Sequence, residues 1–109
     1  MAGKFEVYRD KSGEHRFRLK AGNGEIILSS EGYSAKAGCA NGIESVRKNS
    51  ADAANFEKKE TASGKFRFNL KAANKQVIGT SQSYSSASGR DNGIASVQKN
   101  APDAKVVEA

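Results

Sequence analysis

The feature of this sequence that most constrains its fold is an internal repeat. The segment Asn41–Asn49 returns almost unchanged as Asn92–Asn100, and Leu19 recurs as Leu70, so the two copies are offset by 51 residues. They align from end to end without a gap. A repeat of this length is a supersecondary unit that buries its apolar face only against a neighbour, so we expect the two copies to share one core.

The ends of the chain show where the units begin. Phe5, Phe56 and Val107 stand at the same phase of the repeat, so the chain holds two full units and the start of a third. We take residues 1–53 as the first repeat and residues 54–109 as the second repeat with a closing strand. A chain of 109 residues fits a single domain.

Each repeat opens with three short stretches that alternate between apolar and polar residues, a pattern typical of half-buried strands. They cover residues 4–9, 15–20 and 25–28 in the first copy, and residues 54–60, 65–71 and 76–78 in the second. Asn23-Gly24 predicts a type I′ hairpin turn, because both residues tolerate the positive φ that this turn needs. The short turns make each set an antiparallel meander. Lys58 stands where the first copy has Val7, so we expect its strand to lie near an edge.

The later part of each repeat predicts a helix. In the first copy Ala35, Cys39, Ile43 and Val46 follow one another at helical spacing. Ser34, and Ser85 in the second copy, are suited to cap the first turn through their hydroxyl groups. Pro102 is expected to end the second helix, and Lys105–Glu108 reads as a final short strand.

Glycines inside the predicted helices recur in both copies. Gly38 and Gly42 of the first copy return as Gly89 and Gly93, although each costs about 1 kcal/mol relative to alanine in a helix. We infer that a Cβ would clash there, where the helix lies close to the sheet or to its twin. The alternative is that Asn41-Gly42 breaks the segment into two short turns.

These elements combine into an α+β fold. It is built of tandem β-β-β-α repeats plus a C-terminal strand, with one shared antiparallel sheet and both helices on one face. The terminal strands are expected to be exchanged between the repeats, with pseudo-two-fold symmetry. We expect the strand of Phe56 to form the seam between the halves.

The residues resemble a known family. The string FRLKAGNGEIILSSEGYSAKAGCANGIESVRKN, with its echo FNLKAANKQVIGTSQSYSSASGRDNGIASVQKN, is similar to the YegP-like family of small bacterial domains of unknown function. The resemblance covers nearly the whole chain. It implies β-β-β-α repeats that share a sheet and exchange terminal strands, and it implies no established activity and no catalytic residues. The second copy departs at Lys75, Gln76 and Gly79, and Arg90-Asp91 stand in place of Cys39-Ala40.

Composition and charge limit the expected cellular location and the kind of partner. The single cysteine cannot form an internal disulfide, and no long apolar run predicts a membrane span or a signal peptide, so we expect a cytoplasmic protein. The net charge is +6. Residues 1–53 hold nine basic and seven acidic side chains, and residues 54–109 hold nine and five. This excess favours anionic partners but is weaker than the dense basic runs of a committed nucleic-acid binder.

Basic residues alternate along the second strand of each repeat and give candidate anion-binding positions. They are Arg16, Arg18 and Lys20 in the first copy, and Lys65, Arg67 and Lys71 in the second. If symmetry brings the two strands close together, their open face presents a basic field that could grip phosphates. The other interpretation is a solvated face that keeps an antiparallel sheet soluble.

Polar residues that both copies keep are expected to serve turns and helix ends rather than a ligand. They include Asn23 and Asn74, Ser30 and Ser81, Tyr33 and Tyr84, and Asn49 and Asn100. Few residues suggest catalysis. His15 corresponds to Phe66, which favours a structural histidine, and Cys39 lies on the apolar stripe of the predicted helix, which favours a core residue. No cysteine and histidine cluster has metal-ligand spacing. We therefore assign no catalytic, cofactor-binding or metal-binding residue.

The sequence leaves three functional hypotheses, of which the third is an enzyme with an unrecognised site. The first is a non-enzymatic binding or adaptor module that meets an unknown protein partner through its surface or an exposed edge strand. The second is a weak binder of nucleic acid or another polyanion through the basic face. A membrane partner is not expected. Tandem duplication already supplies the symmetry of a dimer of single units, so we predict a monomer.

Overall fold

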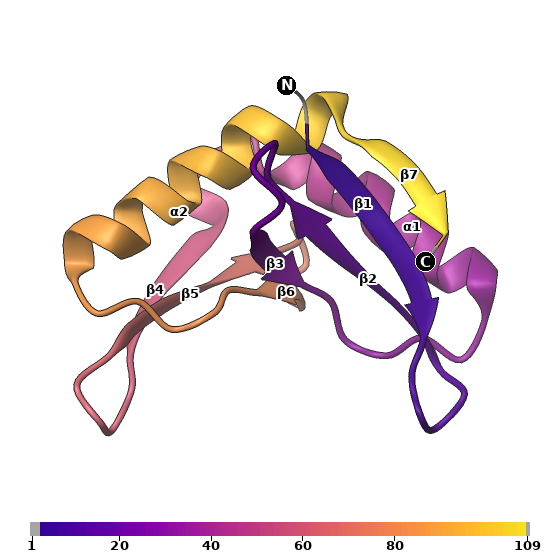
Figure 1. Cartoon of the computed structure of the whole chain (residues 1–109), viewed down its shortest axis with the longest axis horizontal. Coiled ribbons are helices and arrows are strands. Elements are labelled where there is room, and N and C mark those ends of the chain that lie inside the picture. The colour runs from indigo at the N-terminus through magenta and orange to yellow at the C-terminus, as the bar shows by residue number, and fades with distance from the viewer. Residues whose placement is uncertain (1–2, 109) are drawn as a thin grey trace.

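The computed structural model describes residues 3–108 and shows the repeat as two β-β-β-α units followed by a last strand (Figure 1). The strands of the first unit are β1 (Lys4–Arg9), β2 (His15–Lys20) and β3 (Ile26–Ser29), followed by α1 (Lys36–Asn49). The second unit holds β4 (Phe56–Glu60), β5 (Phe66–Lys71), β6 (Val77–Thr80) and α2 (Ala87–Asn100). Short 3-10 turns at Ala53–Asn55 and Ala101–Asp103 lead into β4 and into β7 (Lys105–Glu108).

All seven strands form one sheet in the order β4-β5-β6-β3-β2-β1-β7. The two meanders meet through their third strands, where Ser29 of β3 pairs with Thr80 of β6. The α+β fold class is therefore confirmed, but the predicted seam is wrong. Phe56 lies on β4, at the outer edge of the sheet, as the polar substitution Lys58 indicated. A first strand that carries exposed charges is suited to an edge and not to the middle of a covered sheet.

The last strand completes the exchange between the repeats. β7 follows α2 of the second unit, yet it pairs with β1 of the first, with Phe5 opposite Val106. This pairing is parallel, so the sheet is mixed rather than wholly antiparallel as predicted. β1 and β7 are joined through the rest of the chain and not by a tight hairpin turn, so they are free to run in the same direction.

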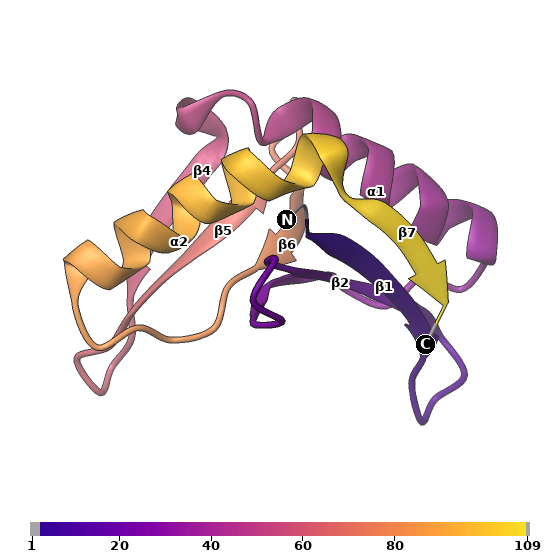
Figure 2. The same cartoon turned by 45° about the horizontal axis from the view of Figure 1, so that its top comes forward.

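Both helices cover the same face of the sheet (Figures 1 and 2). Phe5 and Phe17 meet edge to face with their ring centroids 5.8 Å apart, and Phe56 and Phe68 repeat the contact at 5.6 Å. Leu19 and Leu70 are fully buried beside them. The core is thus continuous across both units, because each meander presents the same apolar side to a helix.

The conserved spacing of glycines has a packing cause. A Cβ on Gly42 would lie 2.5 Å from the hydroxyl oxygen of Tyr33 and 3.0 Å from the Phe17 ring. The Tyr33 ring stacks on Phe17 at 6.3 Å and reaches beneath α1, and burial raises the pKa of its hydroxyl. Gly93 meets Tyr84 in the same way. The predicted clash is therefore confirmed for Gly42 and Gly93, whereas a Cβ on Gly38 would lie at an ordinary 3.4 Å from the Tyr33 ring. α1 continues through Gly42 without a break.

The helices begin later than predicted. α1 has Ala35 at its N-cap with no side-chain hydrogen bond, and α2 is capped by Ser86, whose Oγ accepts from the Gly89 amide at 3.0 Å. Ser34 and Ser85 are therefore not the caps. The backbone of Tyr33 is still bonded to that of His15, and this bridge delays the turn into the helix.

The hairpin turn between β2 and β3 also differs from the predicted type I′ form. Gly24 has a φ of +88°, but Asn23 does not have a positive φ, and a register shift follows Leu19. Asn23 instead accepts a hydrogen bond from the Glu25 amide at 3.0 Å. The loop is thus a wider turn that needs one left-handed residue rather than two.

Candidate functional site

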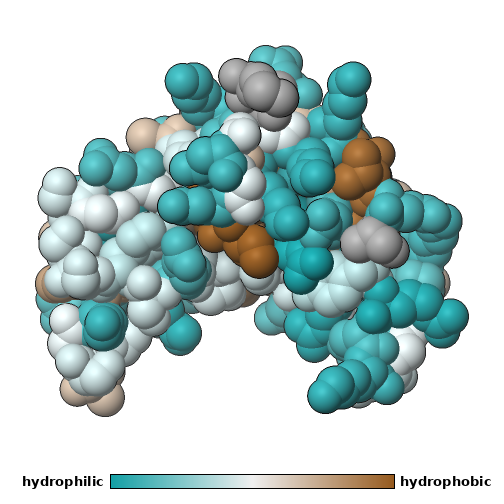
Figure 3. All heavy atoms as spheres, viewed as in Figure 1, coloured by the Kyte–Doolittle hydropathy of each residue, from teal (hydrophilic) through white to brown (hydrophobic). Residues whose placement is uncertain are grey.

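The face of the sheet opposite the helices is polar and arched. The hairpin tips of the two units hang apart below the helices, and the space-filling view shows a hollow between them (Figures 1 and 3). In the first unit Glu6 is the centre of this face: Arg18 donates to its carboxylate at 2.6 Å and Lys20 lies at 3.2 Å. These cations hold the pKa of the Glu6 carboxyl below its usual value.

The second unit repeats this arrangement with weaker geometry. Lys71 lies 2.8 Å from Glu57, and Asn69 replaces the arginine at 3.3 Å. Hydrogen bonds from Lys71 and Asn69 lower the pKa of the Glu57 carboxyl. Cross-strand ion pairs of this kind explain why lysine and arginine alternate along β2 and β5.

The six predicted anion-binding residues do not converge. Arg16, Arg18 and Lys20 lie on β2, Arg67 and Lys71 lie on β5, and Lys65 lies just before β5. β3 and β6 separate the two groups, so the condition for a joint basic field, that β2 and β5 lie close together, is not met. Arg16 is also engaged, because its Nε donates to Asp10 at 2.6 Å. Much of the basic face is therefore neutralised by carboxylates within the fold.

The two ends of the sheet differ. At one end β7 covers β1, whereas β4 at the other end has no neighbour beyond it among residues 3–108 (Figure 1). Since β1 and β4 are equivalent strands of the repeat, the place beside β4 matches the place that β7 fills. The outward backbone groups of β4 are therefore available for pairing.

Charged side chains line this free edge. Lys58 of β4 forms an ion pair with Asp91 of α2 at 3.2 Å, and Arg90 lies 3.3 Å from the same carboxylate. The Arg90 guanidinium also lies over the Phe66 ring, 5.4 Å from its centroid. Phe56 is 7% exposed, whereas the equivalent Phe5 beneath β7 is fully buried.

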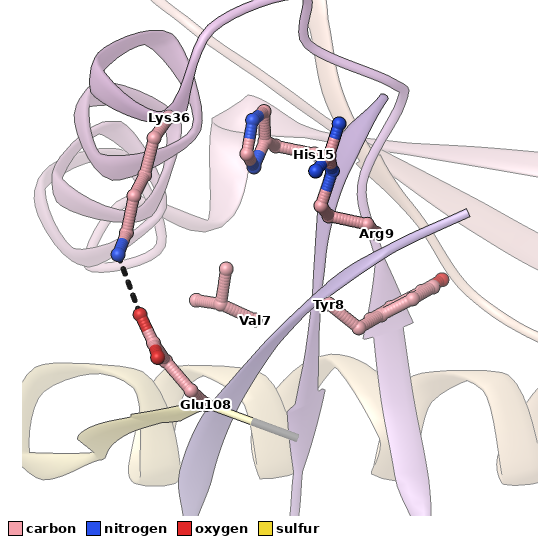
Figure 4. Close-up of a pocket in the computed structure, with 6 residues that line it drawn as sticks. All are labelled: Val7, Tyr8, Arg9, His15, Lys36 and Glu108. Atoms are coloured by element: carbon pink, nitrogen blue, oxygen red, sulfur yellow. Dashed lines mark hydrogen bonds and ion pairs between the residues drawn. The ribbon is translucent and has the colours of Figure 1, made fainter. Parts of the chain in front are cut away.

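A cavity of about 270 Å³ opens at the opposite end of the sheet (Figure 4). It lies where β1 and β2 meet the start of α1 and the end of β7, and it is lined by Val7, Tyr8, Arg9, His15, Lys36 and Glu108. Arg9 and His15 stand together on one side, and Lys36 and Glu108 form an ion pair on the other. The Tyr8 ring points away from it.

Residues 3–108 were compared with the requirements of a metal site and of a reactive cysteine. No group of three or more histidine, cysteine, aspartate or glutamate side chains in this range could hold a metal ion. Cys39 is 1% exposed, and burial raises the pKa of its thiol, which disfavours the reactive thiolate. Within the same range, no helix is long and apolar enough to cross a membrane.

Comparison with known proteins gives the family. The model of a domain of unknown function, DUF1508, matches the chain twice, over residues 10–57 and 62–108. The chain belongs to this family. The two matches correspond to the two repeats, and the resemblance to YegP-like proteins is thereby confirmed.

Relatives of similar length extend this assignment. A UPF0339 protein encoded in the 5′ region of the ptx operon of Stutzerimonas stutzeri is 63% identical over 108 residues, covering 99% of this chain and 97% of the relative. The UPF0339 protein YegP of Escherichia coli K12 is 54% identical over 100 residues, covering 92% and 91%. The solution structure of E. coli yegP, titled a protein of unknown function, matches with a TM-score of 0.94 and 51% identity over 99% of this chain and 93% of that one. The family thus supports the fold and names no activity.

The polar residues kept in both copies serve the backbone. Ser30 Oγ accepts from the Phe17 amide at 2.9 Å, and Ser81 does the same for Phe68. Asn49 donates to the Ser45 carbonyl at the end of α1. These contacts agree with the structural roles predicted for the shared polar set.

Sequence reasoning missed the cavity residues Arg9, Lys36 and Glu108. They lie on strands and a helix that the hydrophobic pattern predicted, but in the sequence each looks like an ordinary surface charge. The signal that could have found Arg9 and Lys36 is a difference between the two repeats, since Arg9 corresponds to Glu60 and Lys36 to Ala87.

Proposed function

We propose that this protein is a non-catalytic binding module that accepts an extended segment of a protein partner as an added strand on the free edge of β4. The observation that carries the proposal is the pairing of β7 with β1, for which the equivalent place beside β4 is open. Strand addition draws its affinity from backbone hydrogen bonds and its specificity from alternate side chains.

The internal pairing supplies the register of the added strand. Opposite Phe5, Glu6 and Val7 of β1 stand Val106, Val107 and Glu108. Their repeat equivalents on β4 are Phe56, Glu57 and Lys58. An incoming parallel strand would therefore place alternate side chains beside Phe56 and Lys58, toward α2.

The residues along the edge define the chemistry of the partner. A small apolar residue opposite Phe56 would cover the 7% of this residue that stays exposed. Two residues later, an acidic side chain would meet Lys58 and Arg90, which share only Asp91 between them. Residues 54–109 carry nine basic and five acidic side chains, which favours an acidic segment as a whole.

The charges on the β4 edge disfavour its pairing with a second copy of the chain. Lys58 and Lys59 are adjacent on β4, and lysines on an edge strand disfavour pairing with another copy. We therefore propose a monomer. We place it in the bacterial cytoplasm, where its single reduced cysteine is compatible with the redox conditions.

The basic sheet face is a second candidate, for weak polyanion binding. Glu6 has three cations within 4.0 Å, namely Lys4, Arg18 and Lys20, so this part of the face keeps a positive excess. The edge is favoured over the face because the six predicted cations lie in two separated groups.

A peptide titration tests the strand-addition proposal. A labelled acidic peptide that contains Val-Val-Glu, the last three residues of β7, is added to the ¹⁵N-labelled protein, and backbone amide shifts are followed. We expect saturable shifts at residues 56–60 with a Kd of about 10–100 µM. Lys58→Glu should weaken binding about tenfold, while Lys99→Glu, the same charge change on an exposed position of α2, should leave it unchanged.

Two results would contradict the proposal. One is that neither this peptide nor a peptide of reversed sequence causes saturable shifts at residues 56–60. The other is a set of shifts confined to residues 4–7, because the peptide would then merely replace β7 on β1.

A further inference from the structure

Most side chains around the cavity beside Arg9 differ between the two repeats. Four residues that line it and Cys39 beside it change at the equivalent position of the second repeat: Val7 to Lys58, Arg9 to Glu60, His15 to Phe66, Lys36 to Ala87 and Cys39 to Arg90. In the second repeat the guanidinium of Arg90 lies over Phe66, whereas the small Cys39 leaves the corresponding space open. The general fold does not require a cavity here, so its residues are free to serve a ligand.

The cavity presents cationic groups with few partners. Arg9 donates a single hydrogen bond, to the Gly13 carbonyl at 3.3 Å, and within residues 3–108 no carboxylate pairs with its guanidinium. The His15 ring, beside it in Figure 4, has no hydrogen-bond partner in the same range, although its backbone is bonded to Tyr33. An arginine of this kind can take a carboxylate through two parallel hydrogen bonds.

One carboxylate already occupies the other side of the cavity. Glu108 Oε1 lies 2.5 Å from Lys36 Nζ, the ion pair drawn as a dashed line in Figure 4. Both side chains are 69% exposed, and exposed ion pairs contribute little to stability. A ligand anion can therefore displace Glu108 from Lys36 at small cost.

Beside the charged groups lies an apolar extension. A second cavity of about 90 Å³ shares Val7, Lys36 and Glu108 with the first. Its remaining walls are Cys39, Ala40, Ile43 and Val106. This extension is suited to a short alkyl group, since sites that bind small molecules combine apolar walls with a few placed polar groups.

We propose that this cavity binds a small organic carboxylate with a short branched alkyl tail. The carboxylate lies between Arg9 and Lys36, with His15 as a further hydrogen-bond donor, and the tail lies on Val7 and enters the apolar extension. Glu108 acts as an internal competitor that the ligand displaces. The site is independent of the β4 edge, because the two lie at opposite ends of the sheet.

Titration of the full chain with isovalerate tests the site, with acetate and inorganic phosphate as comparison probes. Amide shifts of residues 7–9, 15 and 36–40 report binding, and we expect saturation by isovalerate with a Kd of about 1–10 mM. Acetate should bind at least about threefold more weakly, because it lacks the tail. Glu108→Gln should tighten isovalerate binding about threefold or more by removing the competing charge.

Variants of the walls separate a built site from general attraction to a basic protein. Arg9→Gln and Lys36→Gln should each weaken isovalerate binding about fivefold or more, whereas Lys99→Gln, the same charge loss on α2, should not. Unchanged binding in Arg9→Gln would overturn the proposal. So would the lack of saturation in both the wild type and Glu108→Gln, or binding of phosphate as tight as that of isovalerate.

Discussion

Arg47 of α1 donates a hydrogen bond from its Nη2 to the backbone carbonyl oxygen of Ala104, at 2.5 Å and 57 residues away along the chain. The guanidinium also pairs with Glu44 and lies over the Phe5 ring, 5.5 Å from its centroid. Ala104 directly precedes β7. One side chain of the first repeat thus holds the segment that brings the last strand onto β1, and the second repeat has Gln98 in its place.

Arg47→Ala should release this segment. We expect a loss of about 1–3 kcal/mol in the free energy of unfolding, since a charged hydrogen bond to a partly buried carbonyl is removed. Amide hydrogen exchange of residues 105–108 should accelerate more than that of β2. Gln98→Ala is the matched control and should change stability by less than about 0.5 kcal/mol. Equal protection of β7 in both variants would show that Arg47 does not hold it.

Gly42→Ala should destabilise the protein by about 1–3 kcal/mol, because the new methyl group would meet the Tyr33 hydroxyl and the Phe17 ring. Gly38→Ala is the control within the same helix. Its Cβ would lie 3.4 Å from the Tyr33 ring, and alanine favours the helix, so stability should stay within about 1 kcal/mol of wild type. Urea unfolding distinguishes the two, and similar values for both variants would argue against the tyrosine contact as the cause.

Lys75 has a φ of +72° at the position where the first repeat has Gly24. Side chains with a Cβ are strained in this region, so Lys75→Gly should stabilise the protein by about 0.5–1 kcal/mol. The reverse exchange, Gly24→Lys, should destabilise it by a similar amount. Thermal unfolding measures both, and a lower melting temperature for Lys75→Gly would contradict the assigned turn.

Glu6 should make the fold sensitive to acid. Its pKa is lowered in the folded state by the hydrogen bond from Arg18, relative to the usual value of 4.5. A depressed folded pKa means that the stabilisation is complete above the unfolded pKa and is lost as the pH falls through the folded one. The urea concentration at the midpoint of unfolding should therefore decrease as the pH is lowered below about 4.5, and it should decrease less steeply in Glu6→Gln. A parallel decline in both proteins would assign the acid sensitivity to other carboxylates.

The basic sheet face can be tested by retention on heparin. If the face binds polyanions, retention should decrease steeply with salt, and the pair Arg16→Glu and Arg67→Glu should abolish it. The double variant with Lys48→Glu and Lys99→Glu carries the same charge change on exposed helix positions, and heparin should retain it more strongly than the variant with Arg16→Glu and Arg67→Glu. Absence of retention of the wild type at low salt would exclude this second candidate function.

Much of the local structure could be predicted from particular residues. The alternation around Phe17 and Leu19 predicted β2, and Lys58 in the place of Val7 predicted an edge strand. Gly42 predicted a close approach, although not the Tyr33 hydroxyl that causes it. The helix starts were misplaced at Ser34 and Ser85, because the backbone bridge between His15 and Tyr33 lies outside any local pattern.

The candidate sites were harder to predict from the sequence than the local structure. The alternating cations of β2 and β5 were visible, but their partners Glu6 and Glu57 lie on other strands and become neighbours only in the paired sheet. The cavity needs four separate elements to meet, and its residues carry no common spacing. The one signal of the cavity in the sequence is that most of its residues differ between the two repeats, and this signal does not show that they lie together.

The sequence by itself determined the repeat, the order of strands and helices within each unit, and the apolar side that each unit must bury. These follow from periodicity and turn chemistry, which act between residues close together in the chain. Tertiary structure alone decided that β3 meets β6 and that β7 runs parallel to β1. Those outcomes depend on which surfaces fit together across the whole molecule, and no local preference encodes that choice.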